Sequence, residues 1–350
     1  MKILHVINNL DGGGAEKLLS QLLPMLHKDG CEIQLLLLYT SKQATPFAEA
    51  IESSGIVIHR LNFSIGSFIL PAFSVVRFIA KHAFDAVHFH LFPGLYIAGI
   101  AARLTHVPIF YTEHGTDNRR QRFALLRLID RWMYNSLSRV VAISDDVHRA
   151  LIQKGCKPTS VITITNGIRL TSGVVAKTTI PLVFGMAGRF EYPKDQATVI
   201  RAIALMKQPV KLILAGSGSQ LEYCKKLVVT LGIQNKVTFL GFIDDIQSFY
   251  SGLDIHVFSS VHEGFGLTAA ESMAAALPNI ISDIPALKSI VGPAGVVFST
   301  GNAADLANKM NQLMNDTDLY RSCSVNALNR VKSFDIQHTV KGYEKLYQSI

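Results

Sequence analysis

The chain has 350 residues, of which 49% are hydrophobic and 17% charged, and its formal net charge is +8 at pH 7. This length is sufficient for two domains with a core each, and this composition excludes a disordered or fibrous chain. The cysteines lie far apart, without metal-site or redox spacing, so we expect reduced thiols: Cys31, Cys156, Cys224 and Cys323.

The positive charge is concentrated in the first half of the chain. Residues 1–180 carry +7 of the net charge, and residues 181–350 carry +1. We expect an anionic partner for the first half, either a phosphate-bearing acceptor or an anionic membrane surface. Nucleic acid is disfavoured as the partner, because no nucleic-acid-binding motif accompanies the charge.

The chain starts with an apolar strand pattern that runs into a polar loop. Residues 1–8 have neither the apolar length nor the cleavage site of a signal peptide. Residues 91–102, among the longest apolar stretches, fall short of the roughly 20 residues that span a bilayer. We therefore expect a cytoplasmic protein that can bind peripherally to the inner face of the membrane.

Short apolar runs alternate with helical patterns along the chain, which is typical of parallel βαβ units. The sequence therefore predicts an α/β protein with two Rossmann-like domains that face a cleft. A polar segment, 169–179, separates the two series, and residues from 303 onward have helical patterns. The predicted strands are 3–7, 33–39, 56–61, 86–90, 109–112, 140–143 and 161–164, and then 182–187, 211–215, 237–240, 254–258, 279–282 and 295–298.

Three consecutive glycines, 12–14, follow the first predicted strand and open a helix. They do not match the G-x-G-x-x-G dinucleotide motif, but they let the backbone approach a ligand closely. Gly13 and Gly14 are therefore candidate ligand-contacting residues, and a turn without a ligand is the alternative. We interpret Glu16 as a residue that stabilises the first turn of the helix.

His114 follows the predicted strand 109–112, at the strand end from which α/β domains present site residues. His90 also ends a predicted strand and is a second candidate. A basic amphipathic helix is predicted next, with Arg120, Arg127 and Arg131 on one face and apolar side chains gathered towards another. This helix fits a lipid headgroup layer beside an acceptor. A solvated face over a core explains the pattern equally well.

Two cations follow the first strand of the second half, where Arg189 and Lys194 lie in one loop. We expect both to meet a diphosphate at the carboxyl ends of parallel strands. The apolar segment 63–79 in the first half stays open between a buried helix and an acceptor-facing loop.

The loop after the predicted strand 254–258 contains two glutamates, Glu263 and Glu271, with glycines between them. Gly264 and Gly266 allow a tight turn and expose backbone N–H groups at the start of the next helix, where a phosphate is favoured. Carboxylates accept hydrogen bonds from sugar hydroxyls, so we expect the pair to hold polyhydroxyl groups on either side of a diphosphate, with Glu271 on the first helical turn. Alternatively, Glu271 only complements the helix N-terminus and Glu263 is a solvated loop charge.

These four elements in this order, the glycine loop, the histidine, the Arg–Lys pair and the spaced glutamates, resemble the retaining nucleotide-sugar glycosyltransferases of family four (glycosyl transferases group 1). The resemblance covers essentially the whole chain. It implies the GT-B fold, with domains at 1–172 and 173–335 and a helix, 336–350, that returns to the N-terminal domain. It also implies transfer of a hexose or N-acetylhexosamine from a nucleoside diphosphate sugar, UDP being expected, to a glycan or lipid-linked saccharide in bacterial-type polysaccharide or glycolipid assembly.

The resemblance further implies catalytic roles for His114 and Glu263 at the donor sugar and for Arg189 and Lys194 at the departing diphosphate, with Glu271 at the ribose. Arg120, Arg127 and Arg131 are placed on the acceptor or membrane side. The other donor-binding residues would be Gly13, Gly14, Gly216, Gly218, Ile243, Gly264, Phe265, Gly266 and Leu267.

No cofactor or essential metal is expected, because cations and helix termini can neutralise the leaving diphosphate. Residues 316–318 mimic an Asp-x-Asp metal motif, but their place between two helices predicts a helix N-cap. Arg169 and the segment 283–288 depart from the family pattern, which weakens the support for any donor or acceptor identity taken from the family. A GT-B-fold nucleotide-sugar epimerase and a non-catalytic nucleotide-sugar sensor are the alternative functions.

Overall fold

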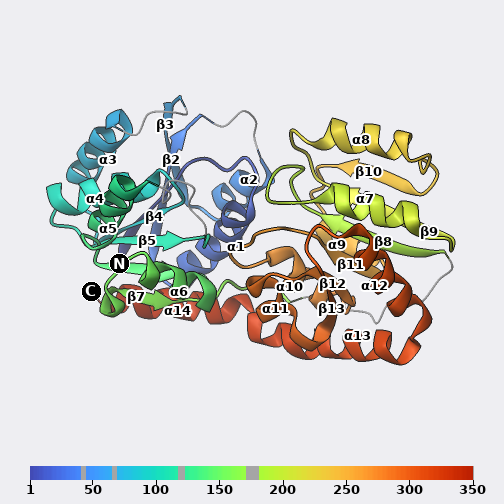
Figure 1. Cartoon of the computed structure of the whole chain (residues 1–350). Helices are drawn as coiled ribbons and strands as arrows, with labels where there is room; N and C mark the ends of the chain where they lie inside the picture. The colour runs from blue at the N-terminus through green and yellow to red at the C-terminus, as the bar shows by residue number, and fades with distance from the viewer. Residues whose placement is uncertain (41–44, 65–68, 117–122, 171–180, 350) are drawn as a thin grey trace. The chain divides into compact units, whose positions relative to one another are not determined.

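The structure is a computed structural model that describes residues 1–40, 45–64, 69–116, 123–170 and 181–349 (Figure 1). The chain divides into two compact units. Unit 1 comprises residues 1–167 together with 336–350, and unit 2 comprises residues 168–335. Most of the predicted polar separator, 169–179, lies outside the described residues, and so does Arg120.

Unit 1 contains a parallel sheet of seven strands in the order β3-β2-β1-β4-β5-β6-β7. The strand order reverses between β1 and β4, as in doubly wound folds. The strands are β1 (Lys2–Ile7), β2 (Glu32–Tyr39), β3 (Val57–Phe63), β4 (Ala86–His90), β5 (Ile109–Glu113), β6 (Arg139–Ala142) and β7 (Val161–Thr163).

The helices of unit 1 bury apolar faces against this sheet. In α1, the leucines at spacings of three and four residues, such as Leu19, Leu22, Leu23 and Leu26, are fully buried, as expected for an amphipathic helix over a core. The helices are α1 (Gly14–Lys28), α2 (Pro46–Glu52), α3 (Ile69–Lys81), α4 (Gly94–Leu104), α5 (Ala124–Tyr134), α6 (Asp145–Gln153) and α14 (Ile336–Gln348), with a short 3-10 helix at Pro158–Ser160.

The C-terminal helix α14 belongs to unit 1, although unit 2 precedes it in the chain (red in Figure 1). Its buried residues Val340, Tyr343, Leu346 and Tyr347 join the hydrophobic cluster formed by β1, β2 and α1. The return of the C-terminal helix that the sequence predicted is therefore confirmed.

Unit 2 contains a parallel sheet of six strands in the order β10-β9-β8-β11-β12-β13, and the order reverses between β8 and β11. The strands are β8 (Leu182–Ala187), β9 (Val210–Ala215), β10 (Val237–Gly241), β11 (Ile255–Phe258), β12 (Asn279–Ser282) and β13 (Gly295–Phe298). The helices are α7 (Gln196–Leu205), α8 (Leu221–Thr230), α9 (Ile246–Ser251), α10 (Leu267–Ala274), α11 (Pro285–Val291), α12 (Ala303–Asn315) and α13 (Thr317–Val331), with 3-10 turns at Gly292–Ala294 and Lys332–Phe334.

Acidic and amide side chains begin several helices of unit 2, because they accept hydrogen bonds from the unpaired N–H groups of the first turn. Asp195 caps α7, Asp245 caps α9 and Asn302 caps α12. Asp316 accepts a hydrogen bond from the backbone N–H of Leu319 at 2.9 Å, so the predicted N-cap at the Asp-x-Asp segment is confirmed.

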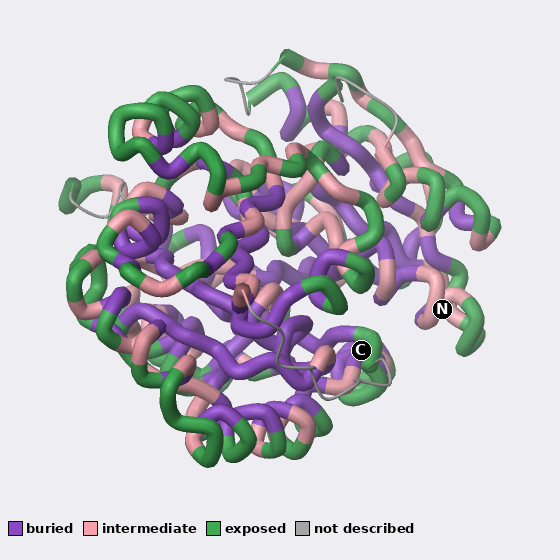
Figure 2. The backbone as a smooth tube through the Cα atoms, turned by 90° about the vertical axis from the view of Figure 1, so that its right-hand side faces the viewer, coloured by how far each residue is buried: buried purple, intermediate pink, exposed green. Residues whose placement is uncertain are grey.

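Buried segments run through the interior, whereas exposed residues are frequent on the outer turns (Figure 2). In β4, β11 and β12 every residue is buried, which is typical of a parallel sheet covered on both faces. Within the described ranges, no helix combines the length and the apolar character needed to span a membrane.

Candidate functional site

The predicted donor residues of the second half gather at the carboxyl ends of the strands of unit 2. Lys194 lies in the loop after β8, and Glu263 in the loop after β11. Because the strand order reverses between β8 and β11, these loops flank the switch point, the usual ligand site of an open α/β sheet.

Three contacts hold the two loops together. The backbone N–H of Val261 donates to the carbonyl of Pro193 at 3.0 Å. The hydroxyl of Ser259 donates to the carbonyl of Asp195 at 2.6 Å. The ammonium group of Lys194 forms an ion pair with a carboxylate oxygen of Glu263. The loops are therefore positioned by each other as well as by their strands.

The Lys194–Glu263 pair is largely shielded from water. The side chains are 18% and 15% exposed, and the ammonium nitrogen of Lys194 lies 4.3 Å from the ring centre of Phe258. A charge in such a place needs an opposite charge, because desolvation of an unpaired ion is costly. Glu263 is therefore a paired residue of the site and not a solvated loop charge.

Glycines let the loops after β8 and β9 pack closely near Lys194. The Lys194 side chain passes over Gly188, where a Cβ would lie 3.5 Å from it. Gly216 has φ +132°, and a Cβ there would lie 2.0 Å from the carbonyl oxygen of Gly188. Gly218 has φ +147°, and a Cβ there would lie 2.6 Å from the carbonyl oxygen of Phe190. The close contact between these loops therefore requires glycine at positions 216 and 218.

The helix α10 presents its N-terminus at the same edge of the sheet. Gly266 precedes the helix with φ +107°, a left-handed conformation that favours glycine. The first N–H groups of a helix have no partner within it and carry a partial positive charge, which favours an anion. Phe265 is buried and its ring lies 5.6 Å from that of Phe334, so the loop of Gly264 and Phe265 is anchored from below.

Glu271 lies on the second turn of α10, because the helix begins at Leu267. The prediction of a first-turn position is wrong by one turn, and the interpretation as a simple partner of the helix N-terminus loses its support. Glu271 is 5% exposed and accepts a hydrogen bond from the hydroxyl of Tyr250 at 3.2 Å. Burial and the neighbouring Glu271 hold the pKa of Tyr250 well above its usual range, so this phenol stays protonated and donates.

Two buried hydroxyls of this region have no hydrogen-bond partner in the described part of the chain. They belong to Ser260, directly after β11, and to Thr268, in the first turn of α10. Buried polar groups are normally hydrogen-bonded. Orphaned hydroxyls beside a helix N-terminus therefore indicate a place where a polar ligand binds.

Arg189 and Ile243 complete the predicted set in unit 2. Arg189 is exposed, and its carbonyl accepts a hydrogen bond from Gln196 at 3.0 Å. Its guanidinium has no recorded ion pair within the described ranges. Ile243, after β10, is half-buried against the cluster of Ala187, Ala215 and Tyr250.

In unit 1, the glycine loop follows β1 and leads into α1. Gly13 is the N-cap of α1, and Gly14 is its first residue. A Cβ at Gly13 would lie 2.4 Å from a carboxylate oxygen of Glu16, so Glu16 folds back over the start of the helix. This agrees with the interpretation of Glu16 as a first-turn residue.

His114 lies just beyond β5 and is half-buried. Burial lowers its pKa to about 4, so the imidazole is neutral at pH 7. Its Nε2 lies 3.4 Å from Nδ1 of His90. His90 is fully buried, which contradicts a direct contact with an acceptor. It contacts His114 instead.

The helix α5 differs from the amphipathic helix over a core that the sequence allowed. Arg127 and Arg131 are exposed, but so are three apolar side chains of the helix and that of the residue before it. These apolar residues are Phe123 at 65%, Leu125 at 69%, Leu128 at 63% and Trp132 at 56% exposed. The alternative of a solvated basic face over a buried apolar face is therefore wrong for these residues.

In the segment 63–79, which the sequence left open between a buried helix and an acceptor-facing loop, residues 65–68 lie outside the described residues and residues 69–79 form most of α3. Ala72, Val75 and Ile79 are buried, whereas Ile69 and Phe73 are 58% and 64% exposed. The helices α3, α4 and α5 are neighbours (Figure 1). The exposed apolar residues of α3 lie in its first two turns, whereas those of α5 extend from the residue before the helix to its last turn. We call this set the apolar rim: Ile69, Leu70, Phe73, Phe123, Leu125, Leu128 and Trp132.

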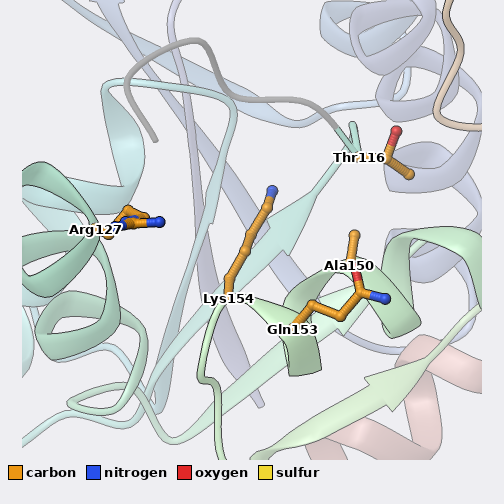
Figure 3. A pocket seen from close by; sticks show the side chains of 5 residues that line it. All are labelled: Thr116, Arg127, Ala150, Gln153 and Lys154. Carbon is orange, nitrogen blue, oxygen red and sulfur yellow. The ribbon is translucent and has the colours of Figure 1, made fainter. Parts of the chain in front are cut away.

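A pocket of about 280 Å³ lies beside α5 and α6, lined by Thr116, Arg127, Ala150, Gln153 and Lys154. The side chain of Arg127 points towards Lys154 (Figure 3). The ammonium nitrogen of Lys154 is buried and has no hydrogen-bond partner in the described ranges. Two cations at one pocket favour the binding of an anionic group there.

Several residues of the site were not found from the sequence. Tyr250, Ser260, Thr268 and Lys154 carry no motif. Tyr250 is identified by its contact with Glu271, and the other three by buried polar atoms without a partner in the described ranges. The ion pair of Lys194 with Glu263 was also missed, although both residues were singled out. The reversal of strand order is the signal that brings these two loops together.

Two family models match adjoining parts of the chain. The model described as Glycosyltransferase Family 4 matches residues 12–172, and the model described as Glycosyl transferases group 1 matches residues 173–330. The chain belongs to glycosyltransferase family 4.

Relatives and solved structures agree with this assignment. An uncharacterized glycosyltransferase of Methanocaldococcus jannaschii, MJ1607, is 39% identical over 108 residues, 30% of this chain and 28% of that protein. The putative glycosyltransferase EpsD of Bacillus subtilis is 24% identical over 78% of both chains. Anabaena Alr3699/HepE in complex with UDP-glucose has a TM-score of 0.86 at 22% identity and full coverage of both chains. This family 4 enzyme therefore has the GT-B fold.

Proposed function

We propose that this family 4 enzyme is a retaining glycosyltransferase that moves a hexose or N-acetylhexosamine from a UDP-sugar to a hydroxyl of a glycan or lipid-linked saccharide. The observation that carries the donor assignment is the shielded Lys194–Glu263 pair at the switch point of unit 2. The complexes of Anabaena HepE with UDP and with UDP-glucose support a UDP-sugar as the donor.

The diphosphate is proposed to lie between Lys194, Arg189 and the start of α10. Lys194 then exchanges its bond to Glu263 for a phosphate oxygen, so that the cation stays paired throughout. As the glycosidic bond breaks, negative charge grows on the diphosphate, and preorganised cations and N–H groups stabilise this charge more than that of the ground state. The released carboxylate of Glu263 is free to accept hydrogen bonds from hydroxyls of the donor sugar.

Glu271 is proposed to hold the ribose. Tyr250 donates to one carboxylate oxygen, which fixes the orientation of Glu271 on α10. A carboxylate held in this way accepts hydrogen bonds from two vicinal hydroxyls, and the ribose is the part of a nucleoside diphosphate that carries such a pair. The cations and the helix terminus provide the charge that a metal ion supplies elsewhere, so we propose catalysis without an essential metal.

The acceptor is proposed to carry an anionic group and to be presented at the inner face of a membrane. Arg127 and Lys154 at the pocket of unit 1 fit a phosphate, and the buried ammonium group of Lys154 gains a counter-charge when one binds. The apolar rim exposes aromatic and aliphatic side chains beside Arg127 and Arg131, the composition of a peripheral membrane surface.

A panel of nucleoside diphosphate sugars tests the proposal. A donor that binds only the folded chain raises its melting temperature, and transfer is then measured with lipid-phosphate saccharides in the presence and absence of EDTA. We expect one UDP-sugar to stabilise the chain and to yield a product with the donor's anomeric configuration. Interconversion of sugars without an acceptor would show an epimerase, and binding without turnover would show a sensor.

A further inference from the structure

A continuous chain of hydrogen bonds runs through the interior of unit 1 from His114 to α14. All of its members except His114 are buried. Its links are His114 to His90 at 3.4 Å, His90 to His5 at 3.0 Å, His5 to Tyr347 at 3.1 Å, Tyr347 to His88 at 2.8 Å, His88 to Thr112 at 2.7 Å, and Thr112 to Tyr343 at 3.0 Å.

A metal site does not explain this cluster. His5, His88 and His90 place ring nitrogens within 4.8 Å of one another, as ligands of an ion would. However, both ring nitrogens of each histidine already take part in a hydrogen bond of the chain. An ion would have to take the lone pairs that these hydrogen bonds use.

The three buried imidazoles are neutral, so all hydrogen bonds of the chain must donate in the same direction along it. Burial lowers the pKa of His5 to about 3, and burial followed by neighbouring histidines lowers the pKa of His88 and His90 well below the usual range. A neutral imidazole has one donor and one acceptor nitrogen, and each hydroxyl donates one hydrogen bond. If one link donates towards His114, every other link must do the same.

Tyr343 sets this direction. Its hydroxyl is buried, and within the described ranges its one recorded hydrogen-bond partner is Thr112. A buried phenol that cannot donate is costly, so Tyr343 donates to Thr112. In sequence, Thr112 then donates to His88, and the last link is the N–H at Nδ1 of His90, which donates to Nε2 of His114.

We propose that this chain fixes the proton of His114 on Nδ1 and that His90 is the positioning residue that holds it there. The catalytic part of this inference rests on the proposed function and on the contact of His114 with the donor sugar that the family resemblance implies: the Nδ1–H then faces a sugar oxygen as a donor. The residue Tyr343 on α14 thereby determines the hydrogen-bonding character of a residue at the end of β5.

Nitrogen-15 NMR of the histidine-labelled full chain tests the tautomer directly, with the His114→Asn variant to assign the signal. We expect a protonated Nδ1 and a lone-pair Nε2 on His114, the reverse of the tautomer that free histidine prefers in water. A proton on Nε2 in the wild-type chain would overturn the inference. Stoichiometric binding of Zn²⁺ that perturbs the signals of His5, His88 and His90 would also overturn it.

Two variants probe the positioning role. His90→Leu removes the donor, and Tyr343→Phe removes the terminal hydroxyl while it keeps the ring. We expect a mixture of His114 tautomers in both, and in His90→Leu a kcat for the sugar donor lower by about fivefold, the effect of one lost hydrogen bond, with KM and UDP affinity unchanged. Tyr96→Phe, which removes a buried hydroxyl outside the chain, is the control with an unchanged tautomer.

The outcomes separate this inference from the proposed function. An Nδ1–H tautomer in a wild-type chain that binds no sugar donor would overturn the proposed function and leave the tautomer assignment standing. Normal transfer by a wild-type chain whose His114 is protonated on Nε2 would overturn the inference alone. An unchanged tautomer in a folded His90→Leu variant would likewise exclude His90 as the positioning residue.

Discussion

Lys194 and Glu263 lie 69 positions apart in the chain and form an ion pair at the edge of the sheet of unit 2. In the proposed function this pair has two states: Lys194 on Glu263, and Lys194 on the diphosphate of the donor. Donor binding would then exchange one shielded ion pair for another, which avoids the desolvation of an unpaired charge.

Replacement of Lys194 by alanine should lower turnover by at least about tenfold. The lost bond is charge-assisted and strengthens as the leaving group gains charge, which is worth roughly 1.5 to 3 kcal/mol. Steady-state kinetics with a UDP-sugar measure the effect. Lys225→Ala, which breaks an exposed lysine–glutamate pair on α8, is the matched control and should leave turnover unchanged. Normal turnover of Lys194→Ala would remove Lys194 from the mechanism.

Replacement of the two glutamates should separate the ribose from the donor sugar. Glu271→Ala is expected to weaken both UDP and the UDP-sugar, whereas Glu263→Ala is expected to weaken the UDP-sugar selectively. Tyr250→Phe should reproduce part of the Glu271→Ala effect, because it frees the carboxylate from its hydrogen bond. Calorimetric titration measures all three variants. Equal losses for both ligands in both glutamate variants would show that the two roles are misassigned.

Replacement of Gly216 by alanine should destabilise unit 2 more than the same change at Gly232. Both glycines have positive φ, +132° and +67°, but a Cβ at Gly216 meets the carbonyl oxygen of Gly188 at 2.0 Å, whereas a Cβ at Gly232 meets nothing within 4 Å. We expect a loss of about 1 kcal/mol in unfolding free energy at Gly232 and at least about 2 kcal/mol more at Gly216. Urea unfolding compares the two, and equal losses would contradict the close backbone approach.

Acid should destabilise unit 1 from about pH 6.5 downwards. Burial lowers the pKa of His5 to about 3 and that of His114 to about 4, against about 6.5 in an unfolded chain. Between these values the unfolded state binds more protons, so stability falls as the pH falls below about 6.5, by about 1.4 kcal/mol per pH unit for each such histidine. Trp132, the single tryptophan of the chain, lies on α5 and reports unfolding of unit 1 by fluorescence. A constant unfolding free energy from pH 7 to pH 5 would contradict the lowered pKa of these histidines in the folded chain.

Membrane binding should depend on both charge and the apolar rim. Replacement of Arg120, Arg127 and Arg131 by glutamine should weaken binding to anionic liposomes by about 1 kcal/mol for each cation near the surface, with a salt dependence that reflects a screening length of about 8 to 10 Å. Replacement of Leu125 and Leu128 by serine should weaken binding at every salt concentration, since burial of apolar surface is not screened. UDP-sugar affinity serves as the control in both.

Co-sedimentation with vesicles measures this binding. If it is insensitive to salt and to both sets of changes, the rim does not contact lipid, and the result would favour a soluble, uncharged saccharide as the acceptor.

The order of strands and helices was predictable because the sequence patterns that indicate each element lie within a few neighbouring residues. The predicted strands 86–90, 182–187 and 279–282 match β4, β8 and β12 to the residue, since each is a short run with apolar residues at its centre. The glycines of the loops after β8, β9 and β11 were also informative, because only glycine tolerates the positive φ at Gly216 and Gly266.

The contacts that define the candidate site were not predictable in the same way. The exposure of Leu125 and Trp132 contradicts the usual reading of an amphipathic helix, in which the apolar face is the buried one. The position of Glu271 depends on where α10 starts, and helix boundaries are weakly encoded in sequence. The buried histidine chain links residues that lie 342 positions apart, as in the contact of His5 with Tyr347, and no periodicity of a single segment reveals such a contact.

The placement of α14 in unit 1 has a consequence for synthesis on the ribosome. Residues 168–335 emerge before Ile336–Gln348, so unit 2 can fold while the core of unit 1 still lacks the side chains of Val340, Tyr343 and Leu346. During this interval the apolar surface of α1 that α14 later covers is open to water and to other nascent chains. The newly made enzyme is therefore expected to need chaperone protection until α14 has emerged, although all strands of the two sheets have already been made.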